Sequence, residues 1–137
     1  MTRRRAGFTF VEILVALAVF GALTAIAVPR YRTFKERAYV ATLKSDLGVL
    51  RIAQEAYWSE NQLYATDSTA LDWKPSSKVK VAINSSDLMA GFTAVATHDN
   101  MPTGHCTTYV GRDATTTPSG QIVCTLGTLA TGSGVTP

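Results

Sequence analysis

The stretch Arg3-Arg4-Arg5-Ala6-Gly7-Phe8-Thr9-Phe10-Val11-Glu12, followed by an uncharged run from Ile13 to Val28, decides the fold of this chain. The 21 residues from Phe8 to Val28 contain one charged side chain, Glu12. A helix of that length spans about 30 Å at ~1.5 Å per residue, which is the thickness of a bilayer's hydrocarbon core. Because a carboxylate in apolar surroundings is costly, Glu12 is expected to have a functional partner.

The charge of the chain is concentrated at its start. Thirteen Lys and Arg residues stand against ten Asp and Glu, for a net charge of +3. Arg3, Arg4 and Arg5 account for that excess, so the chain after Gly7 is formally neutral and its charge does not indicate binding to nucleic acid. A second basic cluster, 30–37, directly follows the apolar run and is expected to meet lipid headgroups.

The apolar run has one ordinary interpretation, a secretory signal peptide. It has a basic start, an apolar centre and a small-residue cleavage pattern at Ala25-Ile26-Ala27. The remainder would then be a secreted or membrane-anchored binding domain. Against this interpretation, Glu12 interrupts the apolar centre early and the helical pattern continues past Ala27.

A second interpretation rests on a resemblance. The segment Gly7-Phe8-Thr9-Phe10-Val11-Glu12, with its short basic leader and the apolar helix up to Pro29, resembles the processing site of type IV prepilins and of the pseudopilins of type II secretion. Phe10 stands where that family more usually has Leu. The resemblance is sharp over roughly the first thirty residues, whereas the rest of the chain agrees in pattern only.

The resemblance implies a role for three residues. A prepilin peptidase would cut between Gly7 and Phe8 on the cytoplasmic side and methylate the new amine of Phe8. Glu12 would neutralise the Phe8 amine of a neighbouring subunit and so set the axial register. In an apolar filament core an isolated carboxylate is unfavourable, while a hydrogen-bonded ion pair is tolerable.

The resemblance also implies partners and a location. The partners would be further copies of the chain in a helical polymer, other pilins, prepilin peptidase, an inner-membrane assembly platform and, before assembly, the lipid bilayer. The chain would be a single-pass precursor in the bacterial inner membrane and then part of an extracellular or cell-surface filament. A pseudopilin of a type II secretion system would share this N-terminal chemistry and is the closest alternative.

A helical pattern resumes after Pro29, where a kink is expected because proline removes a backbone donor. Apolar residues at three-four spacing, with Gln54 in the same stripe, predict an amphipathic helix to about Asn61. That stripe is Val40, Leu43, Leu47, Leu50 and Tyr57, while Lys44, Asp46, Arg51, Glu55 and Ser59 are expected on other faces.

Four segments of alternating or β-prone residues follow a connecting loop at 61–75: they are 78–84, 91–97, 105–110 and 121–126. They predict three or four antiparallel strands laid on the helix, an α+β fold that matches the pilin pattern. The expected parts are a leader at 1–7, a transmembrane or filament-core helix at 8–29, an amphipathic half at 30–61, a globular head at 62–127 and a flexible tail at 128–137.

The two cysteines, Cys106 and Cys124, belong to no CxxC motif. If the C-terminal region is exported, a disulfide is the expected state, worth about 3 kcal/mol for a loop of roughly twenty residues. The alternative is two buried free thiols.

No constellation in the sequence indicates an enzyme, and no cofactor is expected. His98 and His105 lie near predicted strand ends, but their spacing fits no standard zinc pattern. Asp99, Asn100 and Asp113 are the oxygen donors nearest to a calcium site of the kind found in some pseudopilins, and they are scattered over loops. We therefore predict no metal site.

Overall fold

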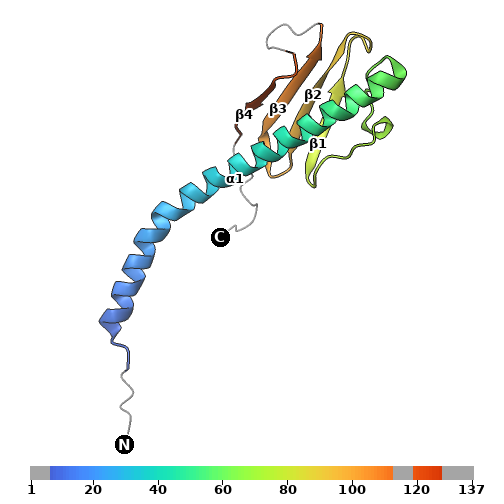
Figure 1. Ribbon diagram of the computed structural model, residues 1–137. Coiled ribbons are helices and arrows are strands. Elements are labelled where there is room, and N and C mark those ends of the chain that lie inside the picture. Colours follow the sequence, from blue (N-terminus) through green and yellow to red (C-terminus); the bar gives the residue numbers. More distant parts are fainter. Residues whose placement is uncertain (1–6, 113–118, 128–137) are drawn as a thin grey trace, which may run out of the picture. The chain divides into compact units, whose positions relative to one another are not determined.

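The computed structural model describes residues 7–112 and 119–127 (Figure 1). The chain divides into two compact units, residues 1–34 and 35–137, and each is described by itself. The elements in chain order are α1 (Phe10–Asn61), a short 3-10 helix η1 (Ser68–Ala70), β1 (Val79–Asn84), β2 (Gly91–His98), β3 (Met101–Gly111) and β4 (Ile122–Thr125). The leader before Gly7, Asp113 and the tail at 128–137 lie outside the described residues.

The first unit contains the N-terminal part of α1. The helix begins at Phe10, two residues after the expected start, and it remains helical through Pro29. Every residue from Phe10 to Phe34 is exposed. One turn after the proline, the Thr33 hydroxyl donates to the Pro29 carbonyl oxygen at 3.3 Å. The kink expected at Pro29 stays a prediction.

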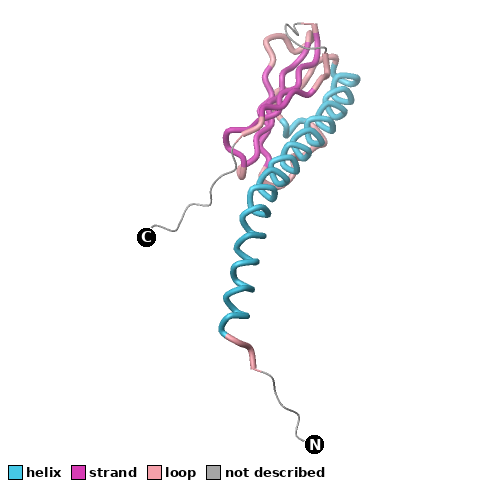
Figure 2. The backbone as a smooth tube through the Cα atoms, turned by 90° about the vertical axis from the view of Figure 1, so that its left-hand side faces the viewer, coloured by secondary structure: helices cyan, strands magenta, loops and turns pink. Residues whose placement is uncertain are grey.

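The second unit places the C-terminal part of α1 against one face of an antiparallel sheet with strand order β1-β2-β3-β4 (Figures 1 and 2). The predicted α+β fold is confirmed, with four strands rather than three. We call the sheet and the loop before it, residues 62–112 and 119–127, the head. β3 begins four residues earlier than expected, because Asp99 and Asn100 form a tight turn that brings Met101 directly opposite His98.

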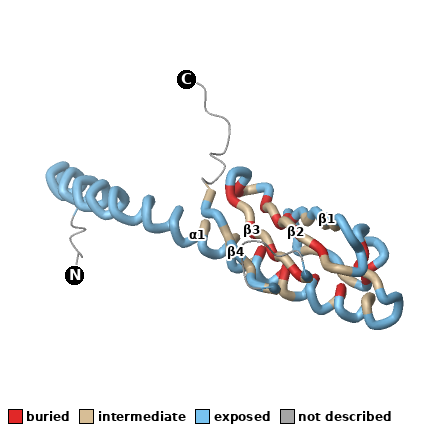
Figure 3. Tube along the Cα trace, turned by 90° about the horizontal axis from the view of Figure 1, so that it is seen from above, coloured by how far each residue is buried: buried red, intermediate tan, exposed pale blue. Residues whose placement is uncertain are grey.

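The core of the second unit lies between α1 and the sheet. Leu43, Leu47 and Leu50 on α1 are fully buried, as the helical stripe predicted. Along β2, buried and half-buried positions alternate, so that Phe92, Ala94 and neighbouring even-numbered positions face the helix (Figure 3). Alanines at the centre of this face leave room for the leucines of α1 to pack closely.

One prediction about the helix faces was wrong. Asp46 was expected on a face of the helix other than the apolar stripe, yet it is buried with the stripe and only 7% exposed. Its carboxylate accepts hydrogen bonds from the Ser76 backbone N–H at 2.9 Å and from the Ser76 hydroxyl at 2.8 Å. Those two donors compensate the carboxylate for the loss of water. Asp46 therefore ties the end of the connecting loop to α1.

The connecting loop predicted at 61–75 contains one short helical turn, η1. Tyr64 and Leu71 are buried, and Trp73 packs against the same core while partly exposed. The Tyr64 ring lies 5.1 Å from the Phe92 ring, centre to centre, in a tilted arrangement. The loop therefore covers one side of the core rather than running free over the surface.

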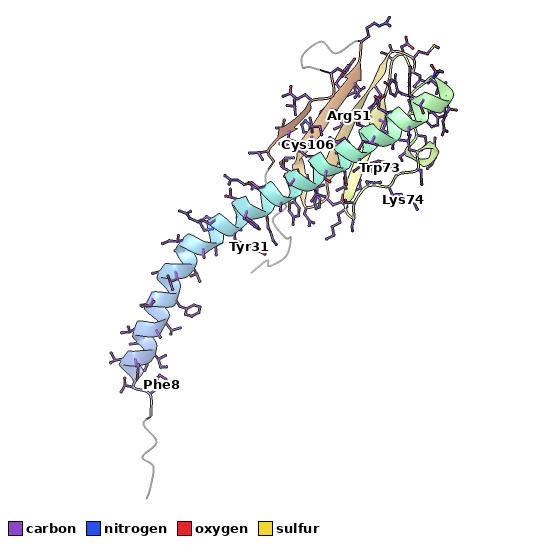
Figure 4. All side chains as sticks on the ribbon, viewed as in Figure 1. Phe8, Tyr31, Arg51, Trp73, Lys74 and Cys106 are labelled. Carbon is purple, nitrogen blue, oxygen red and sulfur yellow. A yellow bond between two sulfur atoms is a disulfide. The ribbon has the colours of Figure 1, made fainter. Side chains whose placement is uncertain are left out.

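Cys106 and Cys124 form a disulfide between directly opposite residues of β3 and β4. Figure 4 shows Cys106 on the sheet beside the helical segment that carries Arg51. The Arg51 guanidinium donates to the Gly120 carbonyl oxygen at 2.9 Å, so the residues just before β4 are also held to α1. Free buried thiols, the alternative left open by the sequence, do not occur here.

Candidate processing and assembly site

The junction between Gly7 and Phe8 lies in non-helical backbone just before α1 (Figure 4). Phe8 is 80% exposed. A Cβ atom placed on Gly7 would meet nothing within 4 Å. The packing of the described residues therefore does not require glycine at this position. An exposed, non-helical peptide bond next to a residue without a side chain is accessible to a peptidase.

Thr9 and Glu12 form a reciprocal cap at the start of α1. The Glu12 backbone N–H donates to the Thr9 hydroxyl at 3.3 Å, and the Thr9 backbone N–H donates to Oε2 of Glu12 at 3.4 Å. This is the capping-box arrangement, in which two residues three positions apart each bind the other's backbone N–H through a side chain. The Glu12 N–H is shared with the Thr9 carbonyl oxygen, to which it donates at 3.1 Å. Sequence reasoning missed this cap, although the Thr-x-x-Glu spacing was a sufficient signal.

The cap defines the chemical setting of Glu12. Its carboxylate lies in the first helical turn, where the positive end of the helix dipole favours an anion. Within the part of the chain that the structure describes, Oε2 makes the bond to Thr9 and Oε1 has no hydrogen-bond partner. One carboxylate oxygen is therefore available to a donor from outside the chain.

None of the described residues covers the apolar surface of the first half of α1. Among the described residues, α1 is the one helix that is long and apolar enough to cross a membrane, judged by length and composition. Its first half presents a nearly continuous set of large apolar side chains to solvent, which is typical of a membrane or protein interface. They include Phe10, Val11, Leu14, Leu17, Phe20, Leu23 and Ile26.

The candidate metal donors are engaged elsewhere or outside the described residues. Asp99 forms an ion pair with Lys80, whose Nζ donates a hydrogen bond to Oδ1 of Asp99 at 2.7 Å. This hydrogen bond holds the pKa of Asp99 below its usual value. Asn100 donates its backbone N–H to Nδ1 of His98 at 3.1 Å and its side-chain amide to the Tyr39 hydroxyl at 3.3 Å. Asp113 falls in the segment that the structure does not describe.

The two histidines are not brought together. His105 lies opposite Thr97 in the sheet register, so His98, the next residue along β2, points to the other face. Within residues 7–112 and 119–127, no group of three or more His, Cys, Asp or Glu side chains is arranged to hold a metal ion.

Residues 2–28 match the family described as the prokaryotic N-terminal methylation motif. The type IV major pilin protein of Myxococcus xanthus (strain DK1622) is 32% identical over 72 residues, which are 53% of this chain and 33% of that protein. The type IV major fimbrial protein FimA of Dichelobacter nodosus is 29% identical over 122 residues, 88% of this chain and 70% of that protein.

A third relative belongs to a secretion system. The type II secretion system core protein G of Aeromonas hydrophila is 34% identical over 70 residues, which are 51% of this chain and 49% of that protein. The chain thus spans a third of the Myxococcus protein and half of the Aeromonas protein, but more than two thirds of the Dichelobacter protein. All three relatives carry the names of structural proteins rather than of enzymes.

Proposed function

This chain belongs to the family of type IV pilins and the related pseudopilins, and we propose that it is a structural subunit of a type IV pilus-like filament. The observation that carries the proposal is the apolar first half of α1, wholly exposed and headed by the single carboxylate Glu12. Exposure of this apolar surface to water is unfavourable for an isolated chain. A bilayer before assembly and neighbouring copies of the same helix after assembly would both cover it.

We propose that Met1–Gly7 is a leader removed by a prepilin peptidase, which also methylates the new amine of Phe8. The accessible backbone at the junction supports cleavage there. Since a Cβ on Gly7 would clash with none of the described residues, a requirement for glycine would come from the active site of the peptidase. The resulting mature chain would begin one residue before the capping box.

Glu12 would pair with the Phe8 amine of a neighbouring subunit. The charges are opposite, both groups lie at the same end of the apolar helix, and Oε1 is available among the described residues. Only one axial offset between two helices would join these groups, so the ion pair would specify register as well as compensate the buried charge. The Thr9 amide would hold the carboxylate in place through Oε2.

We further propose the cellular setting that the family implies. The precursor would span the bacterial inner membrane through residues 8–29 and would be handed to an assembly platform in that membrane. Residues 30–61 and the head at 62–127 would follow on the other side. The finished product would be a cell-surface filament, built from this chain and other pilins, with a mechanical or adhesive role rather than a catalytic one.

A pseudopilin of a type II secretion system is the second candidate, and the similarity to core protein G favours it. The two candidates differ in the product. Deletion of a pilus subunit removes surface filaments seen by electron microscopy, whereas deletion of a pseudopilin leaves exported enzymes in the periplasm without loss of surface filaments.

The first test is the N-terminal sequence and intact mass of the mature protein from its native host. A start at Phe8 with one added methyl group is the expected result. A start at Val28 would mean that the apolar run is an ordinary signal peptide and that the chain is a secreted binding domain, which would overturn the filament proposal.

The second test replaces the carboxylate. Glu12→Gln keeps the size of the side chain and removes its charge, so the variant is expected to insert and be cleaved but to yield few or no filaments. Glu60→Gln, an exposed carboxylate in the last turn of α1, is the matched control and is expected to assemble normally. Normal filament yield from Glu12→Gln would refute the register role.

A further inference from the structure

A hollow of about 380 Å³ opens on the sheet where β1 turns into β2. Its wall includes Asn84 at the end of β1 and the turn residues Ser85, Ser86 and Asp87. Thr93 on β2 and Tyr109 on β3 complete the polar part of the lining. None of these residues belongs to the processing and assembly site.

The strand register explains why the hollow exists. Asn84 lies opposite Thr93, and Thr93 lies opposite Tyr109, so the three side chains form one row across three strands. Thr93 is flanked on β2 by Phe92 and Ala94, which face α1, and so the row points away from the helix. Two spacings of about 4.8 Å separate Asn84 from Tyr109, with the short Thr93 side chain as the floor between them.

Two of the lining residues hold the turn in place. The Ser85 hydroxyl donates to the Gly91 carbonyl oxygen at 2.6 Å, and Oδ1 of Asp87 accepts the Met89 backbone N–H at 2.9 Å. A turn fixed by its own side chains presents its remaining polar atoms without a large ordering cost.

The other polar groups of the hollow are available to a ligand. In the part of the chain that the structure describes, the side chains of Asn84, Ser86, Thr93 and Tyr109 make no hydrogen bond. They offer an amide, two aliphatic hydroxyls and a phenol, which both donate and accept. The Tyr109 ring adds an apolar surface at one end of the row.

The charge of the lining limits the class of ligand. No Lys, Arg or His is among the described residues that line the hollow, and Asp87 contributes a carboxylate. Phosphate, sulfate or carboxylate ligands would meet no opposite charge there. We propose that the hollow binds one neutral pyranose unit of a glycan, with a C–H face of the sugar on the Tyr109 ring and its hydroxyls on Asn84 and Thr93.

This proposal does not depend on filament assembly, and its test does not require filaments. Full-length protein is prepared in a zwitterionic detergent without a sugar headgroup. Methyl glycosides of neutral hexoses and of N-acetylhexosamines are titrated, and contact is read by saturation-transfer NMR on the glycosides. At least one glycoside is expected to bind with a Kd in the millimolar range, typical of a single sugar ring on an open site.

Three variants test the assignment of the hollow. Thr93→Phe fills the floor with a residue that strands favour, and Tyr109→Ala removes the stacking surface; each is expected to weaken binding by about tenfold or more. Thr125→Ala, on the same face of the sheet but opposite His105, is the matched control and is expected to bind normally. Thermal melting by circular dichroism verifies that each variant is folded.

Several outcomes would overturn the proposal. One is the absence of binding by every neutral glycoside up to about 100 mM, well above the expected Kd. Another is undiminished binding by folded Thr93→Phe. A third is binding of sulfate or tetramethylammonium that is stronger than binding of any neutral glycoside and that Thr93→Phe and Tyr109→Ala abolish. The hollow would then select a charged ligand.

Discussion

Gln54 of α1 and Ala65 of the connecting loop are joined by two hydrogen bonds. Nε2 of Gln54 donates to the Ala65 carbonyl oxygen at 2.6 Å, and the Ala65 backbone N–H donates to Oε1 of Gln54 at 2.9 Å. Gln54 is 0% exposed. The side-chain amide of Gln54 thus pairs with the backbone of Ala65 as a neighbouring β-strand would. Because both ends of this amide are hydrogen-bonded, a polar residue can lie in the apolar stripe of the helix.

Gln54→Leu is expected to lower the free energy of unfolding of the head by about 2–4 kcal/mol. The substitution keeps most of the volume but leaves the Ala65 N–H and carbonyl buried without partners, and each such group costs about 1–3 kcal/mol. Urea denaturation followed by tryptophan fluorescence measures the change. Glu60→Gln, on the exposed side of the last helical turn, is expected to alter stability by less than about 0.5 kcal/mol. Equal effects of the two substitutions would contradict this role of Gln54.

Cys106→Ser is expected to destabilise the head by about 3 kcal/mol in the chain-entropy model, since the disulfide closes a loop across a separation of 18 residues. The variant is expected to insert in membranes normally, because the bond lies in the second unit of the chain. Limited proteolysis of the head and membrane fractionation measure the two effects. The double variant Cys106→Ala and Cys124→Ala serves as control, because a reducing agent is expected to destabilise the natural protein and not this variant. Unchanged protease resistance of Cys106→Ser would contradict the prediction.

Periodicity made most of the fold predictable. The three-four spacing of Leu43, Leu47 and Leu50 defines a stripe that tertiary packing buries, and alternation in 78–84 and 91–97 corresponds closely to β1 and β2. These signals are strong because a helix or strand with one buried face must repeat apolar residues with its own period. The end of α1 at Asn61 followed from the same pattern.

Polar residues that satisfy distant backbone groups were not predictable in this way. Asp46 bonds Ser76, thirty residues along the chain, and nothing local in the sequence identifies that partner. The hollow beside Thr93 likewise depends on strand register, which places Asn84 and Tyr109 on either side of it. The cap at Thr9 differs, because it is local and its spacing was visible.

Thr9→Ala is expected to loosen the first turn of α1. The substitution removes the hydroxyl that accepts the Glu12 N–H, and loss of such a cap costs about 0.5–2 kcal/mol. Amide hydrogen exchange of the full-length protein in micelles measures the effect, and the Glu12 N–H is expected to exchange roughly threefold to thirtyfold faster. Thr9→Ser retains a hydroxyl and is expected to restore protection. Unaltered exchange in Thr9→Ala would show that the cap does not stabilise the helix start.

His98 joins the sheet to α1 through a buried ring. It stacks on Tyr39 with ring centres 4.2 Å apart, and its Nδ1 accepts the Asn100 backbone N–H. Burial lowers the pKa of His98 below 6.5, the nearby charge of Asp99 opposes this shift, and Lys78 adds to it. The neutral imidazole is therefore the form that the fold stabilises.

The sign of the pH dependence follows from that shift. Above pH 6.5 His98 is neutral in both the folded and the unfolded chain, and its contribution to stability is complete. As the pH falls below 6.5 the unfolded chain takes up a proton more readily than the folded one, so stability declines until the pH reaches the lowered pKa. Urea midpoints at about pH 7.5 and about pH 5.5 are expected to show this decline in the natural protein. His98→Phe, which keeps a ring against Tyr39 but cannot titrate, is expected to lose most of this pH dependence. His105→Gln, on the opposite face of the sheet, is expected to retain it, and a pH dependence that follows His105 instead would refute the assignment to His98.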